Sequence, residues 1–139
     1  MPSFVVQHHL SKKEHWDFRL EINGKLKSWA VTKIPPRTKN IKRLAIKVED
    51  HPLSYGKFQG KIKEGYGKGL VKIWDKGKYK LESKSSKKIV FYLKGKKLNG
   101  KYVLITLENP RFSGPKKSKR FFRETGYGKN KNGWLFFKV

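Results

Sequence analysis

The 139-residue sequence contains no cysteine, which excludes disulfide bridges and metal sites built on thiolates. No apolar run approaches the roughly 20 residues of a membrane-spanning helix, and the chain does not open with a signal-peptide pattern. We therefore expect a cytoplasmic protein that makes no contact with membranes. Acidic residues are scarce as well, at 10 against 35 Lys and Arg, which gives a formal net charge of +25. A field of this sign attracts polyanions and predicts contact with nucleic acid, while self-repulsion favours a monomer.

The remaining composition suits a single β domain covering residues 1–139, with a core rich in Phe, Trp and Tyr. No long segment has a helical period, whereas short alternating runs are separated by Gly, Asn and Lys-rich turns. We predict an all-β, mainly antiparallel fold: a compact closed or nearly closed β-barrel with little helix. In the second half of the chain, strands are predicted at 70–75, 77–82, 88–94, 101–107 and 133–139.

Asn23-Gly24 separates two alternating runs and is typical of a two-residue hairpin turn. Pairing across this turn predicts four cross-strand pairs: Asp17 with Ala30, Arg19 with Ser28, Phe18 with Trp29, and Trp16 with Val31. One face of the hairpin is then aromatic and β-branched, as a core face should be. On the other face, small residues lie beside the polar side chains and leave space for an ion and a ligand.

That polar face carries His15, Asp17, Arg19 and Glu21, a row that solubility alone does not require. Together with His9, it offers two imidazole nitrogens and one carboxylate, a donor set that suits Mn²⁺, Fe²⁺, Zn²⁺ or Co²⁺. A guanidinium beside such an ion can bind two phosphate oxygens at once, as Lys cannot. The pattern therefore predicts a metal ion that holds a phosphate.

A second alternating run covers residues 43–50 and ends at Pro52. Its spacing predicts an apolar face of Leu44, Ile46 and Val48. The opposite face would be shared by Arg43, Lys47, Glu49 and His51.

The segment FVVQHHLSKKEHWDFRLE at 4–21, followed by LKSWAVTK, RLAIKVEDHPLSY and WLFFKV, resembles the 3′-phosphoesterase domain of bacterial DNA ligase D and its free-standing relatives. The second half matches at WDKGKY and LNGKYVLITL. The resemblance implies a compact β-barrel and a metal site formed by His9, His15 and Asp17. It favours Mn²⁺ as the ion, with Co²⁺ or Zn²⁺ as substitutes.

The resemblance also implies roles for seven further residues. Arg19, Arg43 and His51 would contact the phosphate, Lys33 and Tyr55 would line the site, and Glu49 and Gln7 would matter for diester cleavage. The implied activity is removal of a 3′-phosphate to leave a 3′-hydroxyl on DNA or RNA–DNA primer-template ends, beside a separate ligase or polymerase. Family members also remove a 3′-terminal ribonucleoside. That step stays open, because relatives assist it with N-terminal residues that have no counterpart in this sequence.

Two alternatives use the same residues differently. A non-catalytic nucleic-acid-binding barrel would explain the charge, with Tyr66, Tyr79 or Phe122 stacking on bases, but not the polar face. A non-haem iron oxygenase would use His15, Asp17 and His51 as its ligands, but the charge and the arginines argue against it. The basic, turn-rich segment 110–132 is predicted to be a long loop.

Overall fold

The computed structural model describes residues 1–63, 68–107 and 132–139. Regular structure in these ranges comprises strands β1 Ser3–Ser11, β2 His15–Ile22, β3 Lys25–Val31, β4 Lys42–Pro52, β5 Gly60–Ile62, β6 Gly69–Lys84, β7 Lys88–Gly95, β8 Asn99–Thr106 and β9 Gly133–Lys138, and the 3-10 helix η1 Leu53–Lys57. Within the described ranges, no helix has the length and apolar character needed to cross a membrane. The predicted loop at 110–132 and the aromatic residues Tyr66 and Phe122 lie outside the ranges described, except for Asn132.

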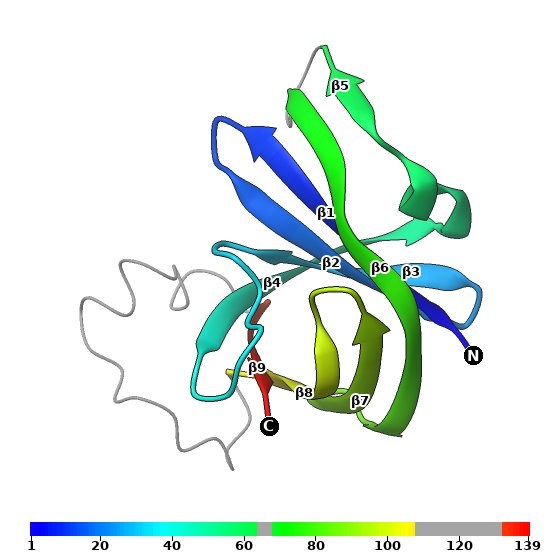
Figure 1. The fold of residues 1–139 in the computed structure, drawn as a ribbon, viewed down its shortest axis with the longest axis vertical. Helices are drawn as coiled ribbons and strands as arrows, with labels where there is room; N and C mark the ends of the chain where they lie inside the picture. Colours follow the sequence, from blue (N-terminus) through cyan, green and yellow to red (C-terminus); the bar gives the residue numbers. More distant parts are fainter. Residues whose placement is uncertain (64–67, 108–131) are drawn as a thin grey trace.

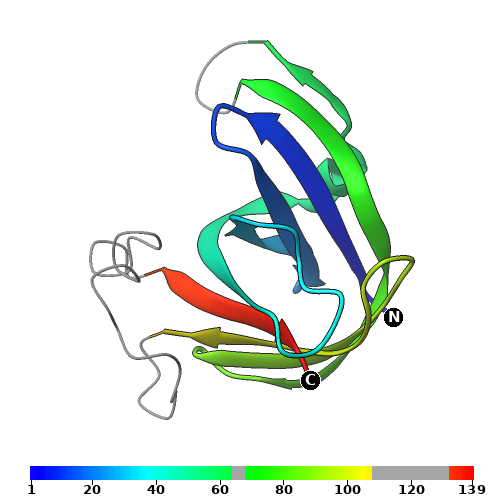
Figure 2. The same ribbon diagram turned by 60° about the vertical axis from the view of Figure 1, so that its left-hand side comes forward.

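Eight strands close into an antiparallel barrel (Figure 1). Their order is β1-β2-β3-β4-β9-β8-β7-β6, and β6 pairs with β1 to complete the ring. The short β5 pairs with Gly69–Val71 at the start of β6 and extends the sheet beyond the ring. Figure 2 shows the strongly curved sheet, with β1 and β6 on one limb and β7, β8 and β9 on the other. The predicted all-β barrel with little helix is confirmed.

The hairpin of β2 and β3 has the predicted register. Asn23 and Gly24 both have positive φ, 52° and 78°, which is the conformation that this turn requires. All four predicted cross-strand pairs are present. The face that carries Phe18 is therefore buried in the barrel interior, and Asp17 and Arg19 lie on the opposite face.

Phe18 lies at the centre of the interior and is fully buried. Its ring centroid is 4.6 Å from that of Phe136, 5.8 Å from Phe91 and 6.2 Å from Phe4. Aromatic rings at these separations supply large apolar area and fix their mutual orientation. These four rings come from four different strands, β1, β2, β7 and β9. Their contacts in the interior therefore help to hold the barrel together.

The strands predicted at 70–75 and 77–82 are a single strand, β6. Gly77 does not break it. A Cβ at this position would meet the carbonyl oxygen of Lys94 on β7, so glycine here permits close approach of two backbones. Tyr79, which was considered as a base-stacking residue, is 1% exposed and donates its hydroxyl hydrogen to the carbonyl oxygen of Glu21, 2.6 Å away. It therefore belongs to the core.

The predicted faces of β4 are correct as far as Val48, since Ile46 and Val48, paired with Ala30 and Ser28, share one face, but the prediction is wrong for His51. Ala45 is the fully buried member of the core, while Leu44 packs on the other side of the sheet against a second cluster around Leu135. Val48 is opposite Ser28, but His51 is opposite Leu26, so β4 has one extra residue between the two pairs. This β-bulge turns His51 onto the face of Val48 and away from Lys47.

The barrel also contains a structural carboxylate, which we expect to be a major contributor to stability. Asp75 is 5% exposed and accepts hydrogen bonds from the backbone N–H groups of Lys96, Lys97 and Leu98, at 2.9, 3.1 and 2.8 Å. Asp75→Ala leaves these donors without their acceptor, and a buried unpaired donor such as that of Leu98 costs about 1–3 kcal/mol. In urea unfolding, we expect the variant to lose about 3 kcal/mol of unfolding free energy.

The matched control is Glu82→Ala, which removes an exposed carboxylate from the same strand, 3.1 Å from Lys101. Exposed ion pairs contribute little, so the control should stay close to wild type. Equal losses in the two variants would contradict the structural role of Asp75.

Candidate metal site and its neighbouring arginine

Three side chains converge at one end of the β1–β2 pair. His9 and His15 are directly opposite each other in the register, and Asp17 follows two residues later on the same face. Their potential ligand atoms all lie within 4.8 Å of one another. Nε2 of His15 is 3.3 Å and Nδ1 of His9 is 4.0 Å from Oδ2 of Asp17. The structure thus brings together the three residues predicted to hold a metal.

The orientation of His15 leaves one ring nitrogen facing the group. Nδ1 of His15 lies 2.9 Å from the carbonyl oxygen of Lys13, to which its N–H donates. Nε2 therefore faces Asp17: it donates to the carboxylate when the ring is protonated, and it offers a lone pair to a cation when the ring is neutral. Burial alone would lower the pKa of His15, but the hydrogen bond and charge of Asp17 raise it above its ordinary value. The same position that favours a proton suits a cation, so the donor set fits a divalent metal ion.

Arg19 lies beside this group and is 3% exposed. Its Nε donates to Oε1 of Gln7 at 2.6 Å, and NH1 donates to Oγ of Ser28 at 2.7 Å. NH1 is also 3.1 Å from Nδ1 of His51, and NH2 is 3.5 Å from Oδ2 of Asp17. Burial lowers the pKa of Arg19, while the Asp17 carboxylate favours its charged form. The guanidinium is therefore held in place from several sides.

This network changes the expected way of binding phosphate. A bidentate grip needs two parallel N–H groups, yet Nε and NH1 are already engaged by Gln7, Ser28 and His51. Among the described contacts, NH2 is the nitrogen left to reach a phosphate oxygen, and it is also the one nearest Asp17. Arg19 thus presents a fixed positive charge and a single donor edge to the metal ligands.

Gln7 connects the strands to η1. It is fully buried, and its Nε2 donates to the carbonyl oxygens of Tyr55 and Phe58 at 2.7 and 3.1 Å. The Tyr55 ring then lies 4.8 Å from the guanidinium carbon of Arg19, a cation–π contact, and 4.6 Å from the ring of His51. Gln7 and Tyr55 therefore position Arg19.

His51 faces two competing partners through the same nitrogen. Nδ1 can accept from Arg19 or, when protonated, donate to the carbonyl oxygen of Glu49, and both are 3.1 Å away. Burial and the charge of Arg19 lower the pKa of His51. Both effects favour the neutral ring, in which Nδ1 accepts from Arg19.

The other predicted site residues are less closely associated with the group. Glu49 is exposed in the bulge and touches His51 through its backbone, and its carboxylate favours the protonated ring. Lys33 is exposed and follows β3 by two residues. β3 ends at the same end of the barrel at which β2 begins with His15. Arg43 shares the face of Ala45 and donates to the carbonyl oxygen of Ile34 at 2.7 Å, so the structure does not bring it to the metal group.

The sequence reasoning missed the part played by Ser28. It was expected only to leave space, but its fully buried hydroxyl accepts from Arg19 and donates to the carbonyl oxygen of Leu26. A signal was available, because the predicted register already placed this hydroxyl opposite the guanidinium. Polar groups buried side by side pair with each other.

The lowered pKa of His51 is measurable by NMR titration of the histidine ring protons. In the wild type we expect a value below the ordinary 6.5, because burial and Arg19 disfavour the imidazolium. Arg19→Gln removes the neighbouring charge, so the pKa should rise. Lys80→Gln, which removes an exposed charge on β6, should leave it unchanged. A wild-type pKa at or above 6.5, or no difference between the two variants, would contradict this arrangement.

Comparison with known proteins identifies the family. The model of the DNA ligase D 3′-phosphoesterase domain matches residues 7–106. The multifunctional non-homologous end joining DNA repair protein LigD of Mycobacterium tuberculosis is 42% identical over 115 residues, which cover 79% of this chain and 15% of that protein. LigD of Pseudomonas aeruginosa is 45% identical over 108 residues, 73% of this chain and 13% of the relative. The sequence thus corresponds to a small part of these relatives, and it belongs to the DNA ligase D 3′-phosphoesterase domain family.

Proposed function

We propose that this chain is a metal-dependent phosphoesterase that removes the phosphate from 3′ ends of DNA and leaves a 3′-hydroxyl. One observation carries the proposal: a buried guanidinium lies 3.5 Å from the carboxylate of a His-His-Asp group. A metal ion and an arginine side by side suit a phosphate that bears two negative charges. The chain belongs to the 3′-phosphoesterase domain family, and its relatives are named as proteins of non-homologous end joining. Both facts support DNA ends as the substrate.

The metal ion, held by His9, His15 and Asp17, would neutralise phosphate oxygens and make phosphorus more electrophilic. We propose Mn²⁺, since two imidazoles and one carboxylate without thiolate suit it, with Co²⁺ and Zn²⁺ as substitutes. Arg19 would hold a further phosphate oxygen through NH2, without side-chain rearrangement, because Gln7 and Ser28 already fix the guanidinium. Charge stabilisation by such a preorganised group is a large contribution in phosphoryl transfer.

In the reaction, a water oxygen bonds to phosphorus, the bond between phosphorus and the 3′ oxygen breaks, and that oxygen takes a proton. His51 is the proposed proton donor. Its ring is neutral beside Arg19, but a phosphate dianion would favour protonation. Protonation at Nδ1 would exchange the contact with Arg19 for one with the carbonyl oxygen of Glu49, and would free NH1 toward the substrate.

Removal of a 3′-terminal ribonucleoside is proposed as a second activity of the same site. Glu49 is exposed next to His51, where its carboxylate could contact a ribose hydroxyl, and Gln7 would act through its hold on Arg19. The proposed partners are primer-template DNA or RNA–DNA ends and a separate ligase or polymerase. Roles for Lys33 and Arg43 in substrate contact are proposals that rest on the family resemblance.

A non-catalytic nucleic-acid-binding barrel remains the second candidate, supported by the net charge of +25. Its aromatic contribution is reduced, since Tyr79 lies in the core. The iron-oxygenase alternative loses its third ligand, because His51 contacts Arg19 while His9 completes the metal group.

The test is a denaturing-gel assay on a 5′-labelled primer-template that ends in a 3′-phosphate, or in a single 3′-ribonucleotide. With Mn²⁺ we expect conversion to the 3′-hydroxyl, and EDTA should abolish it. His15→Ala and Arg19→Lys should each lower the rate by about 100-fold or more, since a metal ligand is lost in one and a planar donor in the other.

His8→Gln is the matched control. His8 is next to a ligand in sequence but on the other face, stacked on Trp16 with 4.4 Å between ring centroids. Its rate should stay within about threefold of wild type, as for changes away from the reacting groups. Absence of conversion with every divalent metal, with retained DNA binding, would favour the binding barrel instead.

A further inference from the structure

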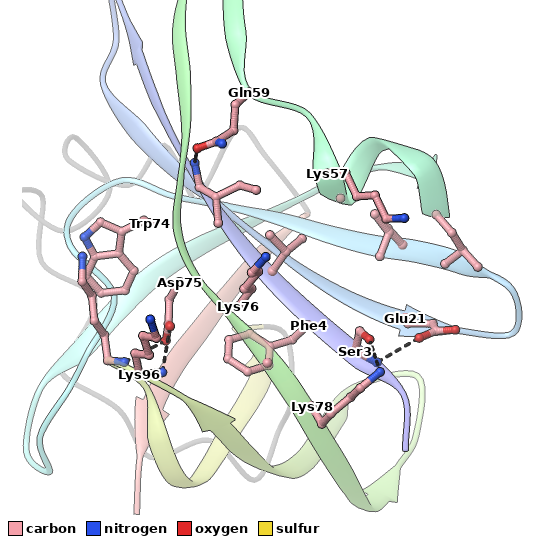
Figure 3. Close-up of a pocket in the computed structure, with 17 residues that line it drawn as sticks. Ser3, Phe4, Glu21, Lys57, Gln59, Trp74, Asp75, Lys76, Lys78 and Lys96 are labelled. Carbon is pink, nitrogen blue, oxygen red and sulfur yellow. Dashed lines mark hydrogen bonds between the residues drawn. The ribbon is translucent and has the colours of Figure 1, made fainter.

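A groove of about 820 Å³ crosses β6 away from the metal group (Figure 3). It lies where the sheet is incomplete: β5 pairs with β6 up to Val71, and β7 pairs with it from Gly77 onward. Between these points, β6 has a strand partner only on its β1 side within the described ranges. There the backbone N–H of Ile73 donates to the side chain of Gln59 at 2.9 Å. The groove therefore lies along the part of β6 that neither β5 nor β7 covers.

Five lysines from three parts of the chain line this groove: Lys57 of η1, Lys76 and Lys78 of β6, and Lys96 and Lys97 of the turn between β7 and β8. Two carboxylates are also present, and both accept hydrogen bonds from backbone N–H groups. Glu21 accepts from the backbone N–H of Ser3 at 2.8 Å, and Asp75 accepts from the backbone of the turn. In the part of the chain that the structure describes, no groove lysine forms an ion pair. The rim is thus positively charged and suits a polyanion.

Apolar side chains also line the groove, and one of them is Trp74, which packs in part against the core cluster. Trp74 is the extra residue of a bulge in β6, between the pairs of Ile73 with Gln7 and Asp75 with Val6. It is half-buried, whereas the other three tryptophans are 8% exposed or less. Nζ of Lys97 lies 4.5 Å from the centre of its ring. An aromatic ring bordered by cations is the arrangement that binds unpaired bases and their phosphates.

We propose that this groove binds a single-stranded segment of nucleic acid, with bases against its apolar side chains and phosphates along the lysines. The site is separate from the metal group, and the binding does not depend on the proposed hydrolysis. It is close enough to act with it, since Val5 in the groove pairs with Arg19. Along β1, Val5 and His9 are about 13 Å apart at the usual rise of a strand. One strand could therefore occupy the groove while an end reaches the metal ligands.

The test combines fluorescence anisotropy of a labelled 15-nucleotide oligo-dT with acrylamide quenching of tryptophan fluorescence, both without divalent metal. Because Trp74 is the accessible tryptophan, bound oligonucleotide should protect it from acrylamide, and Trp74→Phe should abolish this protection. The double variant of Lys57→Gln and Lys96→Gln should weaken binding, and the slope of log K against log salt should fall by about 1.4, since each contact with a single strand contributes about 0.7.

The matched control is the double variant of Lys80→Gln and Lys84→Gln, which removes the same charge from exposed positions on β6 outside the groove. Its salt slope should stay within about half a unit of wild type, as for charges that do not contact phosphate. Equal weakening in both double variants, or no protection of Trp74, would overturn the proposal. Equal protection by polyglutamate would also overturn it, since the groove would then accept any polyanion. Each result is independent of phosphatase activity.

Discussion

The buried guanidinium of Arg19 is the constraint on which the rest of the site depends. A charge that is 3% exposed needs partners, and these come from β1, β2, β3, β4 and η1 through Gln7, Asp17, Ser28, His51 and Tyr55. Removing a partner of a buried charge typically costs several kcal/mol, on the order of 3–5. The register of four strands is therefore tied to one side chain, and the group that would hold a phosphate is also a structural element of the barrel wall.

The bulge in β4 is the second requirement. If β4 were a regular strand with no bulge between Val48 and His51, the imidazole would follow the alternation of the strand and lie on the face of Lys47. The bulge is stabilised by Lys47, whose Nζ donates to the carbonyl oxygen of Val48 at 2.7 Å and lies 3.3 Å from Asp50, and by Lys27, 3.0 Å from Asp50. A local irregularity in pairing thus adds a titratable ring to a site whose other members come from regular strands.

The contrast between β2 and β4 explains how much the sequence predicts. Around Asn23-Gly24 the turn fixes the register, so the pairs of Asp17 and Arg19 followed directly, and the barrel followed from alternation and turn spacing. In β4 no single residue predicts the bulge, because the bulge depends on the pairing with β3 and on contacts between side chains of both strands. Gly77 was likewise not predictable from the sequence. A glycine there indicates the end of a strand, but in the structure β6 continues through it and its backbone lies close to that of β7. Contacts such as Ser28 with Arg19 need the register first, and the position of Arg43 needs the folded sheet.

Arg19 and the lysine-lined groove place positive charge near the His9, His15 and Asp17 group, where a nucleic-acid end and its strand could both be held. We propose that His9, His15 and Asp17 hold a metal ion beside Arg19. The most direct test is anomalous diffraction at the manganese edge from crystals grown with Mn²⁺ and inorganic phosphate. We expect one strong peak within bonding distance of these three side chains, with one phosphate oxygen on the ion and another at NH2 of Arg19. A peak elsewhere, or an empty His-His-Asp group at saturating Mn²⁺, would contradict it.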